Sequence, residues 1–157
     1  MVTIHQAAYH GSLIADAFAM PVHGYYDRSA MDQDYPELDR YLPPCSHHPD
    51  SILWRSEYTP LNEKGEILHD QARFWGQRGI HYHQNLRAGE NTVNFKLAQA
   101  LHHQVSLRGS YDPVDWIEKY IELMRTPNWH NDTYLEEYHR AFFTRYAQGK
   151  SILKCGI

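Results

Sequence analysis

Apolar residues recur at three- and four-residue spacing in four stretches of the chain, which is the period of an amphipathic helix. The stretches cover residues 3–20, 91–107, 113–124 and 134–148. No stretch shows the alternation of apolar and polar residues that is typical of a half-buried strand. The pattern therefore predicts an all-α fold.

Residues that favour helix ends bound each of these stretches. An N-cap side chain accepts hydrogen bonds from free backbone amides, and Pro or Gly commonly follows the last turn. The predicted N-caps are Thr3, Asp112 and Thr133, the last in a capping box with Glu136, and the predicted ends are Pro21, Gly109 and Gly149. Residues 31–60 keep no period and hold five of the eight prolines, so we expect a long loop with short turns there.

The chain has 157 residues, of which 42% are apolar, enough for one packed core, so residues 1–157 are expected to form a single domain. The formal charge of -4 is spread along the chain and does not favour nucleic acid as a partner. No apolar run approaches the roughly 20 residues that span a bilayer, so no membrane association is expected. Cys45 and Cys155 match no zinc or redox spacing and are interpreted as free thiols. We expect a cytoplasmic protein.

Histidine is abundant, with 12 residues in the chain. The adjacent pair His102 and His103 would point about 100° apart on a helix, and no Cys or Asp one turn away completes a ligand set. The motif His81-x-His83 has no such partner in the sequence either. The histidines are therefore interpreted as surface or core residues and not as a transition-metal site.

Asp16 lies within the apolar string "LIADAFAM" of the first predicted helix. A buried carboxylate is costly unless it meets a donor or a cation. Ser12, one turn earlier, is expected to share a polar stripe with it. Asp16 is thus either a structural hydrogen-bonding centre or the border of a site.

The segment Gly89-Glu90-Asn91-Thr92 opens the second predicted helix and has two interpretations. Asn91 or Thr92 can cap the helix, while Glu90 favours the positive end of its dipole. Carboxylate and amide oxygens at a helix N-terminus are also the hard ligands that Mg²⁺ accepts, and such a terminus can face a phosphorylated ligand. Composition and spacing leave both interpretations open.

Several strings together resemble the ADP-ribosylglycohydrolase family. They are "HGSLIADAFAMPVHGYYD", "HYHQNLRAGENTVNFKLAQAL", "YDPVDWIEKYIELM" and "NWHNDTYLEEYHRAFFTRYAQGK", in the order of the family and most similar to its crystallin-like branch. The resemblance covers nearly the whole chain. It implies an all-α fold that binds two Mg²⁺ ions and hydrolyses the bond between ADP-ribose and a side chain or small acceptor.

The resemblance also implies a set of site residues. Glu90, Asn91 and Thr92 fall where the family has metal ligands, and Asp16 and Asp27 fall in its substrate-binding region. Catalytic members carry Thr-Asp-Asp-Thr at the first of these places, so one carboxylate here is lengthened and another is an amide. The family's later Asp-x-Asp segment does not occur in this sequence. We therefore expect the chain to correspond to the N-terminal part of a family member, truncated at the C-terminus, and not to catalyse the reaction alone.

Two other classes of function remain as alternatives. One is a non-catalytic protein, either a crystallin-like structural component or a binder of ADP-ribose or an ADP-ribosylated substrate. The other is a helical interaction domain without a ligand. An incomplete family fold would expose an apolar patch formed by Ile14, Phe18, Leu97 and Leu101, so self-association is expected.

Overall fold

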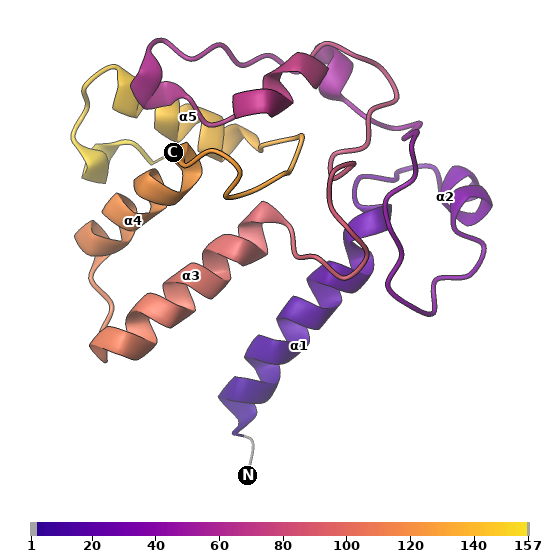
Figure 1. Cartoon of the computed structure of the whole chain (residues 1–157), viewed down its shortest axis with the longest axis horizontal. Helices are drawn as coiled ribbons and strands as arrows, with labels where there is room; N and C mark the ends of the chain where they lie inside the picture. Colours follow the sequence, from indigo (N-terminus) through magenta and orange to yellow (C-terminus); the bar gives the residue numbers. More distant parts are fainter. Residues whose placement is uncertain (1–2, 157) are drawn as a thin grey trace.

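The computed structural model describes residues 3–156 and contains five α-helices in this part of the chain (Figure 1). They are α1 (Ile4–Ala19), α2 (Arg28–Asp34), α3 (Val93–Arg108), α4 (Pro113–Arg125) and α5 (Glu137–Ala147). Short 3-10 turns interrupt the segments between them, and residues 3–156 contain no strand. The prediction of an all-α chain is confirmed.

The four predicted helices correspond to α1, α3, α4 and α5, and several predicted ends are correct. Thr3 caps α1 in a capping box with Gln6. Asp112 accepts hydrogen bonds from the first amides of α4, with Pro113 in the first turn. Gly109 ends α3 with a φ of 74°, in the left-handed region that glycine enters without steric cost.

Two predictions about element boundaries are wrong. The segment 31–60, which was expected to be a loop, overlaps the end of α2. The carboxylate of Asp27, which lies before this segment, caps that helix. The predicted box of Thr133 and Glu136 does not form, because α5 begins only at Glu137. The backbone amides of Thr133 and Tyr134 both donate to the carbonyl of Tyr82 and hold this stretch outside the helix.

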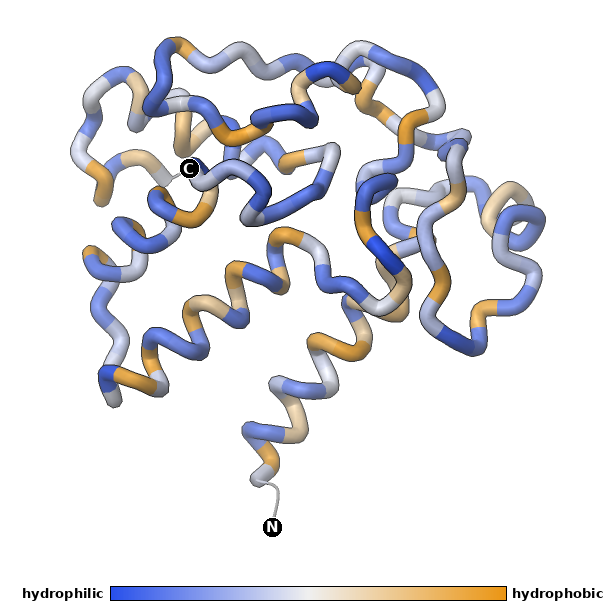
Figure 2. The backbone as a smooth tube through the Cα atoms, viewed as in Figure 1, coloured by the Kyte–Doolittle hydropathy of each residue, from blue (hydrophilic) through white to orange (hydrophobic). Residues whose placement is uncertain are grey.

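The main core lies where α3, α4 and α5 face one another and the loop around residue 67. Its fully buried members include Ile67, Val93, Met124, Leu135 and Phe143. Figure 2 shows hydrophobic residues recurring between hydrophilic ones along these helices, as the helical period predicts. Cys45 and Cys155 are both free thiols, as predicted.

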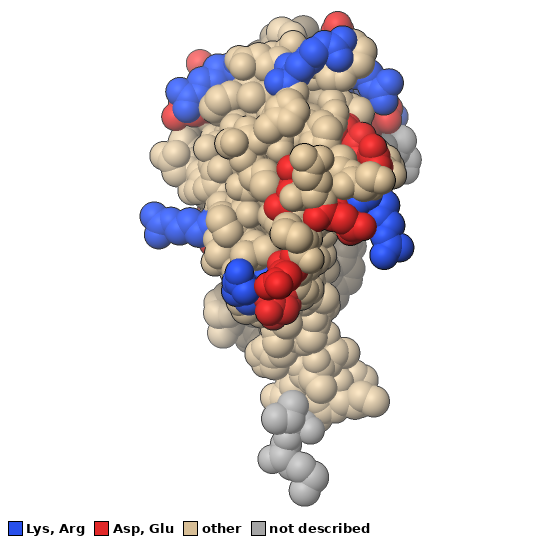
Figure 3. Space-filling view, turned by 90° about the vertical axis from the view of Figure 1, so that its right-hand side faces the viewer, with Lys and Arg blue, Asp and Glu red and all other residues tan. Residues whose placement is uncertain are grey.

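Helix α1 lies at the edge of the molecule and buries little of its length. Only Asp16 and Ala17 among its residues are buried, and Ile14 is 56% exposed. In Figure 3 the lower end of the molecule, where α1 projects, shows no charged side chains on the visible face. The expected apolar patch is wrong in one respect, because Leu97 is only 8% exposed and belongs to the core.

Each helix within residues 3–156 is too short or too polar to cross a lipid bilayer.

Candidate functional site

A buried carboxylate joins α1 to the start of α3. Asp16 Oδ2 accepts hydrogen bonds from the backbone N–H of Thr92 and from Asn91 Nδ2, both at 2.9 Å. Asp16 Oδ1 accepts a third from the Thr92 hydroxyl at 2.8 Å. Both Asp16 and Thr92 are buried. The predicted hydrogen-bonding centre therefore exists, and its partners come from a segment 76 residues away.

This connection changes how α3 begins. Thr92 occupies the N-cap position, but its side chain accepts no capping bond, and its hydroxyl donates to Asp16. The carboxylate of Asp16 instead accepts from an amide at this helix end, where the dipole favours a negative charge. The expected side-chain cap at Asn91 or Thr92 is thus wrong. Ser12 does not join the cluster either, because its hydroxyl donates to the carbonyl of Tyr9.

The other two site residues implied by the family resemblance lie apart from this cluster. Glu90 Oε2 accepts a hydrogen bond from the backbone N–H of Arg87 at 2.7 Å. Asp27 is exposed and accepts from the amides of Ser29 and Ala30 at the start of α2. The structure therefore brings Asp16, Asn91 and Thr92 together and leaves Glu90 and Asp27 outside.

The arrangement of Glu90, Asn91 and Thr92 does not fit a Mg²⁺ site. Asn91 Oδ1 accepts from Gln99, and the Thr92 hydroxyl is committed to Asp16. Mg²⁺ requires several oxygens at short distance in octahedral order. Within residues 3–156, no group of three or more His, Cys, Asp or Glu side chains is placed to hold a metal ion.

Two adjoining pockets lie beside the Asp16 cluster, with volumes of about 260 and 360 Å³. His23, His83, Asn94 and Glu136 line both of them, so we treat the two as one polar cleft. The larger pocket is also lined by Asp16 and Thr92 from the cluster. The described lining includes carboxylates, imidazoles and an amide, but no lysine or arginine.

Two histidines and a carboxylate form a hydrogen-bonded chain that reaches this cleft. Asp132 is fully buried, and its Oδ1 lies 2.7 Å from His83 Nδ1. His83 Nε2 lies 3.1 Å from Nδ1 of the half-buried His23. Burial, and then the neighbouring His83, lower the pKa of His23 below its ordinary value of 6.5. His23 is therefore favoured in its neutral form.

Two other buried histidines support this region through backbone contacts. His81 Nε2 lies 2.9 Å from the carbonyl of Pro21, and its Nδ1 accepts from the backbone N–H of His83. His48 Nε2 lies 2.9 Å from the carbonyl of His23. The interpretation of histidines as core residues is confirmed for these two.

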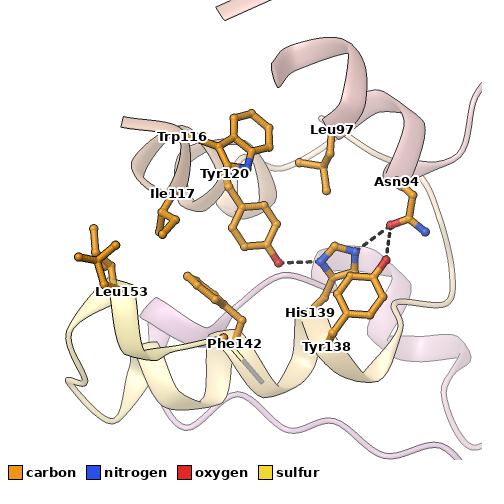
Figure 4. A pocket seen from close by; sticks show the side chains of 11 residues that line it. Asn94, Leu97, Trp116, Ile117, Tyr120, Tyr138, His139, Phe142 and Leu153 are labelled. Atoms are coloured by element: carbon orange, nitrogen blue, oxygen red, sulfur yellow. Dashed lines mark hydrogen bonds between the residues drawn. The ribbon is translucent and has the colours of Figure 1, made fainter. Parts of the chain in front are cut away.

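A separate apolar pocket of about 440 Å³ lies between α3, α4 and α5 and the C-terminal turn (Figure 4). Its polar end is a chain of hydrogen bonds in which Tyr120 faces His139 Nδ1 at 2.6 Å, and His139 Nε2 faces Asn94 Oδ1 at 3.0 Å. Burial lowers the pKa of His139 to about 4. Asn94 Nδ2 donates to Glu136 Oε1 and so connects this pocket to the polar cleft.

Sequence reasoning missed His23, His83 and Asp132 as members of a site. His83 entered only as half of His81-x-His83, and Asp132, directly before the predicted N-cap Thr133, was given no role. The three residues are separated by 60 and 49 positions, and no periodicity connects such distant residues. No local feature of the sequence marked these residues as one site.

The chain matches no protein-family model, and neither a curated protein nor a solved structure matches it.

Proposed function

We propose that this chain is an ADP-ribosylglycohydrolase-like protein whose polar cleft binds the ribose end of ADP-ribose or of an ADP-ribosylated substrate. The observation that carries the proposal is the contact of Asp16 with Asn91 and Thr92. The family resemblance implies that all three residues belong to one site. They lie together beside a pocket of ligand size.

The chemistry of the cleft favours a sugar over a phosphate group. Sugar hydroxyls can donate to carboxylates and accept from an amide, and Asp16, Glu136 and Asn94 offer these groups. The start of α3 would otherwise suit a phosphate, but Asp16 already accepts from an amide there. The diphosphate of ADP-ribose would therefore extend out of the cleft.

A second candidate is a non-catalytic binder of the same ligand. The observation that favours it is the engagement of the expected metal ligands, since Glu90 accepts from Arg87 and Asn91 accepts from Gln99. Residues arranged in this way support no catalytic step that uses Mg²⁺. Hydrolysis that depends on Mg²⁺ would separate the enzyme from the binder.

Calorimetric titration with ADP-ribose tests the proposal. Ala15 lines the larger pocket from an exposed position on α1, so Ala15→Phe should fill its mouth without disturbing the core. Ala8→Phe is the matched control, because Ala8 is an exposed residue of the same helix outside the lining.

The wild type and Ala8→Phe should bind saturably, and Ala15→Phe should bind at least about tenfold more weakly, a change of about 1.4 kcal/mol. Release of ADP-ribose from an ADP-ribosylated peptide, with and without Mg²⁺, then decides between the two candidates. Absence of binding in the wild type, or equal affinity in both variants, would contradict the proposal.

A further inference from the structure

The chain of Asp132, His83 and His23 has a defined direction. An ionised carboxylate only accepts hydrogen bonds, so His83 Nδ1 carries the proton that faces Asp132. In the neutral ring His83 Nε2 is then an acceptor, and His23 Nδ1 must donate to it. The remaining nitrogen, His23 Nε2, is left with a free lone pair.

His23 Nε2 is open to the cleft. Within residues 3–156 it has no hydrogen-bond partner, and it is not among the buried polar atoms that lack one. His23 lines both pockets of the cleft. A basic nitrogen with a fixed tautomer therefore faces a space that a small ligand can enter.

We propose that His23 accepts a proton in the polar cleft and that the proton comes from a hydroxyl group of the ligand or of water. His83 and Asp132 are positioning residues that keep His23 Nε2 unprotonated. For the identity of the ligand this inference rests on the proposed function, in which the hydroxyl belongs to a ribose or to the water that attacks it. The direction of the hydrogen bonds does not depend on that ligand.

The proton transfer balances without any further reactant. The O–H bond of the hydroxyl breaks, its proton joins His23 Nε2, and the oxygen keeps the electron pair as a nucleophile. His23 passes its Nδ1 proton to His83 Nε2. The two rings together gain one proton, and the positive charge ends on His83 beside the carboxylate of Asp132 at 2.7 Å.

The surroundings of His23 are consistent with this role. The carboxylates of Asp16 and Asp132 favour a positive charge on it, while His83 and burial oppose one. Glu136 shares the cleft, His48 Nε2 faces the carbonyl of His23, and the His81 ring lies near those of His48 and His83. The ring is neutral at rest, and carboxylates are close by once a proton arrives. The same carboxylates disfavour an anionic ligand, which supports a hydroxyl.

Nitrogen NMR of the full chain labelled with ¹⁵N-histidine tests the inference, because long-range couplings report which ring nitrogen carries the proton. His23 and His83 should both be Nδ1–H tautomers near neutral pH. His83→Phe keeps a ring of similar size but removes the acceptor, so His23 should lose its fixed tautomer. His103→Gln, at an exposed position of α3, is the control and should leave the signals of His23 unchanged.

A Nε2–H tautomer of His23 in the wild type would overturn the inference, and this measurement needs no variant. A His23 spectrum that His83→Phe leaves unchanged would overturn the coupling. Titration with ribose should shift the Nε2 resonance of His23, and inorganic phosphate should not. The reverse result, or no response to ribose, would overturn the hydroxyl assignment. A response to ribose but not to ADP-ribose would leave the inference standing and count against the proposed function.

Discussion

Asp16 of α1 accepts hydrogen bonds from the backbone N–H of Thr92 at 2.9 Å and from the Thr92 hydroxyl at 2.8 Å. This contact fixes an otherwise exposed helix to the first turn of α3. It also engages the amide and hydroxyl donors that a phosphate at this helix end would use. One buried carboxylate therefore joins α1 to the start of α3 and also lines the adjoining cleft.

Removing the Thr92 hydroxyl should destabilise the protein. Thr92→Val keeps the shape of the side chain but deprives the buried Asp16 carboxylate of a donor, so the free energy of unfolding should fall by about 1–3 kcal/mol. Thr144→Val is the control, because its hydroxyl bonds to the carbonyl of Arg140 at an exposed position of α5. Urea denaturation measures both. An equal effect in the two variants would show that the Asp16 contact contributes little.

Stability should depend on pH through buried histidines. Burial lowers the pKa of His81 to about 3 and of His139 to about 4, from an ordinary value of 6.5. The unfolded chain therefore binds more protons below pH 6.5, and the free energy of unfolding should fall as the pH drops from 6.5 towards 4.

The midpoint of urea unfolding, measured between pH 7 and pH 4, is expected to decrease along this range. His139→Gln should reduce the slope, whereas the exposed His103→Gln should not. A midpoint independent of pH in the wild type would contradict the buried, neutral state of these rings.

Mg²⁺ should bind only weakly to this chain. Glu90 Oε2 accepts from the Arg87 amide, and Asn91 and Thr92 are engaged elsewhere. Glu90→Gln should therefore leave the Mg²⁺ isotherm as weak as that of the wild type or of Glu137→Gln, an exposed site on α5. Saturable micromolar binding that Glu90→Gln abolishes would show a functional metal site.

Gly24, next to His23, should not tolerate a side chain. Its φ is +78°, and an added Cβ would overlap the ring of Tyr82, so Gly24→Ala should destabilise the fold by about 1–3 kcal/mol. Gly11→Ala is the contrast, because nothing lies within 4 Å of its Cβ position in α1. There the change should stabilise by about 0.5–1 kcal/mol. Thermal or urea denaturation of both variants measures the difference, and a neutral Gly24→Ala would refute the close packing of Tyr82.

The exposed apolar residues of α1 should promote self-association. Ile14 is 56% exposed, and Ile4 on the same helix is 80% exposed. Ile14→Glu should reduce association in sedimentation velocity experiments, whereas Tyr26→Glu, 82% exposed but away from α1, should not. A wild-type protein that sediments as a monomer at all concentrations would contradict this expectation.

The sequence by itself determined the helical class and the approximate extents of four helices, because apolar spacing and end residues such as Thr3, Asp112 and Gly109 act locally. It did not locate the start of α5, since the amides of Thr133 and Tyr134 are held by the distant carbonyl of Tyr82.

The candidate site was decided almost entirely by tertiary structure. Asp16 and the segment Gly89 to Thr92 could be singled out from local chemistry, but their contact could not be worked out from spacing. The chain of Asp132, His83 and His23 was not foreseen, because its members are 49 and 60 residues apart. Hydrogen bonds between such distant residues depend on how loops pack around the core, and no local pattern encodes that packing.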